Sequence, residues 1–187
     1  MSGADELRAE STGIEGLYLL GLKAVEDDRG VVREFFRASA LDDAGLTGIG
    51  AWRQVNLTTS RQGVVRGLHG EAMTKLVSVA AGSALGAYVD ARPGSVSFGR
   101  TVTTELVPGR AVLVPRGVCN GFQATAAGET AYLYCFDDEW RPDMAGLAVS
   151  AFDPDLAIAW PIPVDVGDRR LVSAKDAALP RLRDLPG

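Results

Sequence analysis

Histidine is nearly absent from this sequence of 187 residues, in which His69 stands alone. A single imidazole excludes three-histidine zinc sites, two-histidine iron sites and HExxH helices, because each of these needs at least two histidines. Cysteine is almost as scarce. Cys119 and Cys135 could form at most one bridge, and we expect them to be free thiols that are buried as small hydrophobic side chains.

Three other features are missing. Basic residues do not exceed acidic ones, with 19 Lys and Arg against 24 Asp and Glu, so the basic surface of a nucleic-acid-binding protein is absent. No apolar run approaches the roughly 20 residues that a membrane span requires. The polar, acidic start, Met1 to Ser11, does not resemble a signal peptide. These features predict a soluble cytoplasmic protein.

Short β-rich runs separated by turn residues fill the region from Gly30 to Phe136. Runs at this spacing indicate an all-β sandwich or barrel. Short helical turns are expected near Leu41–Ala44 and Ala174–Leu179. Strands are predicted at Val31–Phe36, Gln54–Thr58, Val64–Leu68, Lys75–Ala81, Leu85–Asp90, Arg100–Leu106, Ala111–Val114, Gly121–Ala124 and Thr130–Phe136.

Turn residues and composition outline the organisation of the chain. Gly82-Ser83, between two apolar runs, predicts a hairpin with a type II′ turn. The residues from Arg92 to Ser95 predict a second turn. We expect residues 1–12 to be mobile and residues 13–187 to form one domain. The Pro-rich segment after Pro161 should wrap over the sandwich.

Several side chains that could take part in catalysis or binding are found in this sequence, and each could also have an ordinary structural role. His69 lies beside an apolar run, where a histidine is more often structural than functional. A lysine such as Lys75, at the start of an apolar strand, usually extends to water. Tyr132 and Tyr134 share one strand face, and either could be core packing. Asp176 could simply belong to the first turn of a helix.

Strand alternation poses a question about Arg66 and His69. Three residues apart on a regular strand, they would point to opposite faces, unless Gly67 bends the chain. Pattern alone therefore indicates an all-β domain with a possible site.

Taken together and in order, these segments form a series of motifs that covers about residues 25 to 180. The series resembles the dTDP-4-dehydrorhamnose 3,5-epimerase family of cupin-type sugar-nucleotide epimerases. The motifs are Asp28-Arg29-Gly30, Gln54-x-Asn56, Arg66-Gly67-Leu68-His69, Lys75-Leu76-Val77, Asp90-x-Arg92-Pro93-Gly94-Ser95, Pro115-x-Gly117, Gly121-Phe122, Tyr132-Leu133-Tyr134, Asp153-Pro154-x-Leu156, Trp160-Pro161 and Ser173-x-Lys175-Asp176.

This resemblance implies a jelly-roll β-sandwich, a homodimer with a shared active site, and a reaction without metal or redox cofactor. The implied substrate is a dTDP-4-keto-6-deoxyhexose. Its C4 ketone acidifies the hydrogens on C3 and C5, so a base, an acid on the opposite face and a cationic donor to the enolate oxygen are needed. By resemblance, His69 is the base, Asp176 orients it, Lys75 faces the enolate oxygen and Tyr134 is the acid.

Binding residues follow from the resemblance in the same way. Arg66 should contact the diphosphate through its planar guanidinium, with Arg116 as a further candidate. Arg29 and Glu34 should reach the nucleotide across the dimer interface. Gln54 and Asn56 should line the sugar.

The chain also departs from the family pattern. Asn120 occupies a position that usually holds a second histidine, and Trp140 replaces a tyrosine. The loop Gly70-Glu71-Ala72-Met73-Thr74 is shorter than usual. Both Asn120 and Trp140 belong to the expected sugar pocket.

This variant pattern is most similar to the monofunctional 3-epimerases of antibiotic deoxysugar pathways. We therefore expect inversion at C3 of dTDP-4-keto-6-deoxyglucose, to give the 4-keto-6-deoxyallose sugar. The alternatives are a full 3,5-epimerase, which shares the same catalytic residues, and a non-catalytic sugar-nucleotide-binding cupin. A 3,4-ketoisomerase is disfavoured because those enzymes typically carry a His-x-His pair, and here Gly70-Glu71 follows His69.

Overall fold

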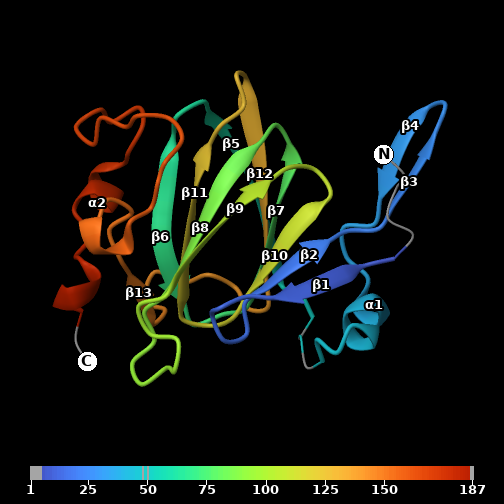
Figure 1. The fold of residues 1–187 in the computed structure, drawn as a ribbon, viewed down its shortest axis with the longest axis horizontal. Helices are drawn as coiled ribbons and strands as arrows, with labels where there is room; N and C mark the ends of the chain where they lie inside the picture. The colour runs from blue at the N-terminus through green and yellow to red at the C-terminus, as the bar shows by residue number, and fades with distance from the viewer. Residues whose placement is uncertain (1–5, 48, 50, 186–187) are drawn as a thin grey trace.

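Two antiparallel sheets stacked face to face form the body of the protein in a computed structural model that describes residues 6–47, 49 and 51–185 (Figure 1). The first sheet has six strands in the order β1-β2-β10-β7-β12-β5, and the second has five in the order β13-β6-β11-β8-β9. A separate hairpin is formed by β3 and β4. The strands are β1 (Arg8–Ser11), β2 (Tyr18–Gly21), β3 (Ala24–Asp27), β4 (Gly30–Arg33), β5 (Gln54–Arg61), β6 (Val65–Glu71), β7 (Lys75–Ala81), β8 (Ala84–Asp90), β9 (Thr101–Leu106), β10 (Arg110–Val114), β11 (Val118–Ala124), β12 (Glu129–Phe136) and β13 (Gly146–Ala148).

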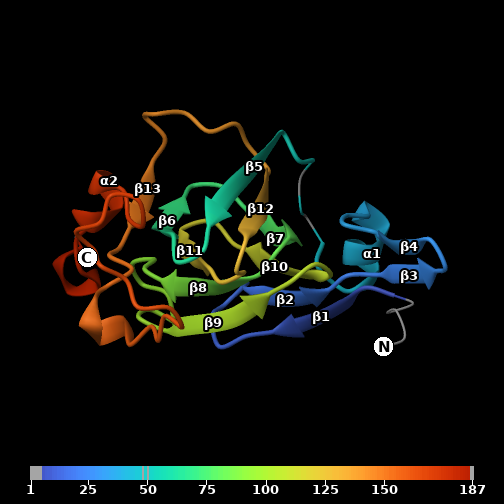
Figure 2. The same cartoon turned by 90° about the horizontal axis from the view of Figure 1, so that it is seen from above.

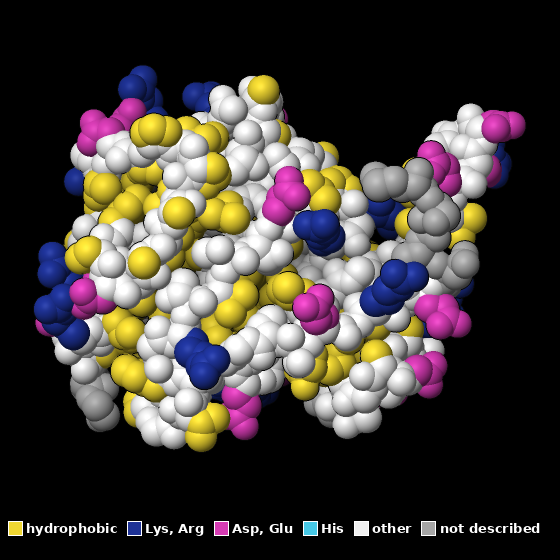
Figure 3. Space-filling model, viewed as in Figure 1, with side chains coloured by type: hydrophobic (Ala, Val, Ile, Leu, Met, Phe, Trp, Pro, Cys, Tyr) yellow, Lys and Arg dark blue, Asp and Glu magenta, His cyan; other side chains and the backbone are white. Residues whose placement is uncertain are grey.

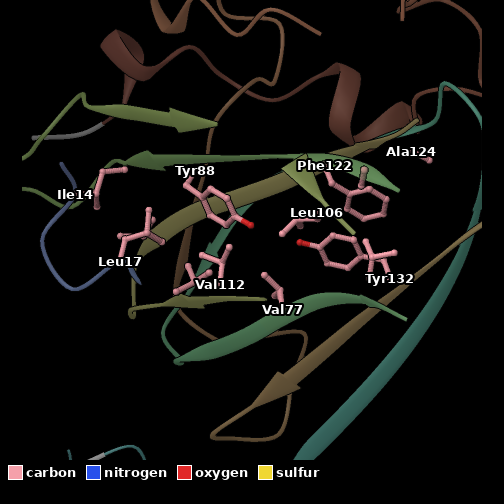
Figure 4. Close-up of a cluster of buried hydrophobic side chains, with 13 residues drawn as sticks. Ile14, Leu17, Val77, Tyr88, Leu106, Val112, Phe122, Ala124 and Tyr132 are labelled. Atoms are coloured by element: carbon pink, nitrogen blue, oxygen red, sulfur yellow. The ribbon is translucent and has the colours of Figure 1, made fainter. Parts of the chain in front are cut away.

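The main core lies between the two sheets, where inward-facing side chains of both meet (Figure 4). Phe122 from β11 stacks on Tyr132 from β12, with ring centroids 4.0 Å apart and planes inclined by 7°. Both rings are fully buried. Burial of a large apolar side chain of this kind stabilises the fold by about 1.5–3 kcal/mol. These contacts hold the two sheets together beneath the site described below.

Each sheet is also covered on its outer face. On the five-stranded sheet, Val65, Leu68 and Val89 pack against residues of the C-terminal segment such as Leu156 and Val172. This segment carries η1 (Pro154–Leu156), α2 (Ala174–Ala177) and η2 (Leu182–Asp184) and lies along the β6–β13 side of the sandwich (Figures 1 and 2). On the six-stranded sheet, α1 (Ala38–Asp43) contributes Leu41 to a cluster with Leu76 and Leu113. Because both faces of β7 are covered, its first five residues are all buried.

The β-sandwich predicted from the sequence is confirmed, and each of the nine predicted strands overlaps an observed one. Both predicted helical turns are present, as α1 and α2, and the segment after Pro161 wraps over a sheet as expected. The turn predicted from Arg92 to Ser95 also forms, since the Ser95 N–H donates to the Arg92 carbonyl at 3.2 Å. Strands β1, β2, β3 and β13 were not predicted.

The predicted Gly82-Ser83 hairpin is wrong. Strand β7 pairs with β10 and β12, whereas β8 pairs with β9 and β11, so the turn joins the two sheets instead of two neighbouring strands. Gly82 does have the positive φ of +81° that such a turn requires. Local turn chemistry reverses the chain, but the choice of a partner strand depends on long-range packing.

The N-terminal region contains a strand that was not predicted. Of the segment expected to be mobile, residues 1–5 lie outside the described residues, while Arg8–Ser11 forms β1 and pairs with β2. Strand β1 is polar and exposed, so its sequence carries no alternating signal. The division into a mobile segment and one domain from residue 13 stays a prediction. None of the described helices has the length and apolar character needed to cross a membrane.

Candidate active site

A cavity of about 430 Å³ opens between the two sheets, a size typical of small-molecule sites. The five-stranded sheet supplies one wall through β6 and β11, and the six-stranded sheet supplies the other through β5, β7 and β12. The C-terminal segment contributes Ser173 and Asp176, at the start of α2, to its lining. Its lining residues are Asn56, Thr58, Arg66, Gly67, His69, Glu71, Lys75, Asn120, Gly121, Tyr134, Phe136, Trp140, Ser173 and Asp176.

A β-bulge in β6 brings Arg66 and His69 into the same cavity. On β11, Asn120 pairs with His69 and Phe122 pairs with Arg66, so two residues of β6 oppose the single residue Gly121. An extra residue of this kind shifts the alternation of side chains by one position. A Cβ atom on Gly121 would lie 2.3 Å from the Arg66 carbonyl oxygen, so the close approach of the two strands requires glycine there.

His69 and Asp176 form a hydrogen-bonded pair, with 2.8 Å between Nε2 and Oδ1. Ser173 begins α2 and accepts the Asp176 N–H through its hydroxyl, which fixes the position of the carboxylate. Burial opposes ionisation of Asp176, but the hydrogen bond from His69 and the Gly67 N–H lower its pKa below the ordinary value. An ionised carboxylate can only accept, so the neutral imidazole carries its proton on Nε2 and keeps a free lone pair on Nδ1.

Lys75 is almost completely buried in the wall of the cavity. Its ammonium donates to the backbone carbonyl of His69 at 2.9 Å and to Oδ1 of Asn120 at 2.6 Å. It also forms an ion pair with Glu71. Burial lowers the pKa of Lys75, and the charge of Glu71 opposes this effect.

Glu71 is a site residue that the sequence analysis did not identify. It lies two residues after His69 on β6 and lines the same cavity. Burial would raise the pKa of Glu71, but the ammonium of Lys75 lowers it below the ordinary value. A carboxylate four residues before a lysine, across a short turn between two strands, is the signal that could have revealed the pair. Thr58 and Ser173 are lining residues that were also missed.

Tyr134 enters the cavity from β12, in the sheet opposite to His69. Tyr132, on the same face, is instead enclosed in the core under Phe122. Packing therefore distinguishes two tyrosines that strand alternation could not. Burial raises the pKa of Tyr134 well above its ordinary value, although nearby Arg66 opposes this, so the phenol keeps its proton at neutral pH.

The polar residues expected around a sugar surround the same cavity. Asn56 lines it directly, and the Gln54 amide donates to Oδ1 of Asn56 at 3.1 Å. The side-chain oxygen Oε1 of Gln54 in turn accepts the backbone N–H of Trp140 at 2.7 Å. This hydrogen bond holds the loop after β12 at the cavity. Arg66 donates to Ser60 of β5 at 3.0 Å and so links the two walls.

Four predicted binding residues are not among those that line the cavity. One of them, Gln54, is hydrogen-bonded to two that are, Asn56 and Trp140; the others are Arg29, Glu34 and Arg116. Arg116, expected as a further diphosphate contact, forms an ion pair with Asp137 at 3.1 Å and is not among the lining residues. Arg29 lies at the tip of the β3–β4 hairpin. Glu34 comes directly after β4 and forms an ion pair with Arg37. This hairpin stands out from the body at the upper right of Figures 1 and 3.

The two cysteines are buried free thiols, as expected. Burial raises the pKa of Cys119 to about 12 and that of Cys135 to about 11. Among the described residues, no group of three or more His, Cys, Asp and Glu is arranged to hold a metal ion. The cavity brings together an imidazole and an ammonium, from opposite sheets, and a phenol, which are groups that can transfer protons or stabilise a developing negative charge.

Comparison with known proteins identifies relatives of this chain. A family model described as dTDP-4-dehydrorhamnose 3,5-epimerase matches residues 11–184. A protein RmlC homolog of Streptococcus pyogenes is 42% identical over 110 residues, which make up 57% of this chain and 55% of the relative. A dTDP-4-dehydrorhamnose 3-epimerase of Streptomyces niveus is 32% identical, with 92% of this chain and 88% of the relative aligned. Among solved structures, NovW, a 4-keto-6-deoxy sugar epimerase from the novobiocin biosynthetic gene cluster of Streptomyces spheroides, is 28% identical with a TM-score of 0.87, covering 98% of this chain and 92% of that one.

Proposed function

The chain belongs to the dTDP-4-dehydrorhamnose 3,5-epimerase family, and we propose that it inverts C3 of dTDP-4-keto-6-deoxyglucose to give the 4-keto-6-deoxyallose sugar. One observation carries the proposal. His69 and Tyr134 enter the same cavity from opposite sheets, as a base and an acid must do to remove a proton from one face of a ring and return it to the other.

The proposed reaction begins when Nδ1 of His69 takes the C3 proton and Asp176 stabilises the imidazolium that forms. The electron pair of the broken C–H bond moves into an enolate, whose charge rests on O4. Lys75 stabilises this oxygen by charge and hydrogen bonding. Tyr134 then delivers a proton to the opposite face of C3. Both steps move protons and leave the sugar's oxidation state unchanged, so no redox cofactor is called for.

Trp140 supports inversion at C3 alone. Inversion at both C3 and C5 requires the sugar to take up a second pose, so that each carbon in turn lies between the base and the acid. Trp140 lines the cavity, and its backbone N–H donates to the side chain of Gln54. We propose that this bulky residue, held at the cavity through its backbone, restricts the second pose, while Asn120 shapes the pocket beside Lys75.

We propose that Arg66 binds the diphosphate and that Gln54 and Asn56 line the sugar. The guanidinium of Arg66 reaches the cavity and offers several donors to a phosphate.

We also propose a homodimer in which the β3–β4 hairpin carries Arg29 and Glu34 to the site of the partner subunit. Exposed apolar side chains favour this arrangement: Val32 on the hairpin is 76% exposed, and Leu57 on the edge strand β5 is 63% exposed. Light scattering coupled to size-exclusion chromatography measures the oligomeric state. A monomer would contradict the proposal.

Proton NMR of dTDP-4-keto-6-deoxyglucose with the enzyme in D2O, with the product trapped by a ketoreductase, tests the reaction. Deuterium at C3 only, in an allo-configured product, is the expected result. Deuterium and inversion at both C3 and C5 would make the protein a 3,5-epimerase and refute the role given to Trp140. Binding without exchange at either carbon would make it a sugar-nucleotide-binding module. Assignment to a cytoplasmic antibiotic deoxysugar pathway stays a prediction.

A further inference from the structure

The Lys75 ammonium has three partners within the protein. It donates hydrogen bonds to the backbone carbonyl of His69 and to Oδ1 of Asn120, and it forms an ion pair with the carboxylate of Glu71. A substrate oxygen that pairs with the ammonium therefore competes with these partners.

Glu71 is the partner that can give way. The carbonyl of His69 belongs to the β6 backbone, and Asn120 is buried. The side chain of Glu71 is 24% exposed and lines the cavity, whereas that of Lys75 is 3% exposed. The carboxylate can therefore turn toward the open space when another anion meets the ammonium.

Glu71 is also the group that compensates the charge of Lys75. The other ionisable group of β6 beside Lys75 is the imidazole of His69, which can carry only positive charge. On β11, Asn120 is uncharged and the buried Cys119 thiol keeps its proton. On β12, Tyr134 keeps its proton as well. Among the described residues, Glu71 is the carboxylate within ion-pair distance of Lys75.

A lysine this deeply buried tends to lose its proton unless an opposite charge accompanies it. We propose that Glu71 is a positioning residue that keeps Lys75 charged and directed into the cavity until the enolate oxygen replaces the carboxylate. The inference rests on the proposed function, because the anion that replaces Glu71 is the enolate of a 4-keto sugar.

The charge state of Lys75 can be measured without any substrate. The lysines of the sequence are Lys23, Lys75 and Lys175, so K23R/K175R leaves Lys75 as the one lysine. Growth with 13C-labelled lysine then gives a single Cε signal, whose shift follows the loss of the ammonium proton with rising pH. In this background the same signal should also move in the acid range, where Glu71 takes up its proton. No acid-range movement would overturn the contact itself, whatever the variants below do.

Replacement of Glu71 by glutamine keeps the size of the side chain and removes its charge. In E71Q the midpoint for Lys75 should move down by at least about one pH unit, the lower end of the effect of one adjacent opposite charge. E71D, which retains a carboxylate, should keep most of the wild-type midpoint. E129Q makes the same chemical change at an exposed position of β12 and should leave the midpoint unchanged. An equal midpoint in E71Q and the parent would overturn the proposal.

Activity gives an independent measure. The alkaline limb of the kcat profile, followed by deuterium exchange at C3, should move to lower pH in E71Q by the same amount as the Lys75 midpoint. One unit corresponds to about a tenfold loss of rate on that limb. A parent enzyme that shows no exchange at any pH would refute the proposed function, whereas an active parent with an unchanged E71Q profile would refute the role of Glu71.

Discussion

Replacement of Asp176 by asparagine tests the central pair of the site with little change in shape. The carboxylate lies 2.8 Å from Nε2 of His69 and can only accept a hydrogen bond, so the free lone pair of the neutral ring stays on Nδ1. An asparagine amide can instead donate to Nε2. The ring proton then moves to Nδ1, which is the atom that has to act as the base.

The expected loss follows from the strength of this contact. A hydrogen bond to a charged group contributes about 1.5–3 kcal/mol, and about 1.4 kcal/mol corresponds to a factor of ten in rate. Weaker stabilisation of the imidazolium therefore slows proton abstraction by roughly 10- to 150-fold, and the wrong tautomer adds to this. We expect D176N to exchange the C3 proton at least about 100 times more slowly than the wild type in D2O, as measured by NMR.

Stability supplies a second readout with a defined sign. The pKa of Asp176 is lowered in the folded protein, so its contribution to stability is present above the unfolded pKa and disappears as the pH falls through the folded value. D176N should therefore be less stable than the wild type at pH 7, with a smaller difference in acid. D155N makes the same change at an exposed carboxylate that pairs with Arg183, and it should exchange normally. A folded D176N protein with the wild-type exchange rate would refute the reasoning.

Three further predictions concern single groups. Y134F should still exchange the C3 proton with solvent but should not invert C3, because the base remains and the acid on the opposite face is lost; NMR of the recovered sugar distinguishes the two. Hydrogen bonds from Arg92 and two serines hold the pKa of the buried Asp90 well below its ordinary range, although burial opposes this. D90N should therefore lose about 1.5–3 kcal/mol of unfolding free energy at pH 7, and the loss should shrink toward pH 3, as measured by urea denaturation. Burial raises the pKa of Cys119 and Cys135, so iodoacetamide should label neither thiol until the protein is unfolded, and rapid labelling of the native protein would contradict the buried positions.

The sequence predicted those parts of the fold that depend on local pattern. Apolar alternation and turn residues located the strands that build both walls of the cavity, and the order of the motifs located His69, Lys75, Tyr134 and Asp176. What alternation could not decide was the choice between two tyrosines on one face. That choice depends on Phe122, which reaches Tyr132 from the other sheet.

Glu71 and the Gly82-Ser83 turn show why the remainder escaped prediction. Glu71 belongs to β6 because the short strand β13, far along the chain, pairs with it at Gly146. Without that partner, a glutamate between glycine and alanine looks like a loop residue. Gly82 has the positive φ expected of it, but the strands on either side belong to different sheets because each finds its partners elsewhere. In both cases the deciding contacts are distant in sequence.

The bulge in β6 fixes the distance between two groups of the site. Arg66, proposed to bind the diphosphate of the substrate, and His69, proposed to take the C3 proton of its sugar, are separated by a short stretch of one continuous strand. The spacing between the two ends of the substrate is therefore set by covalent backbone and does not change when the sheets shift against each other. An alanine at Gly121 would press on that stretch at the Arg66 carbonyl, so a single methyl group on the neighbouring strand would change the distance over which the sugar is held.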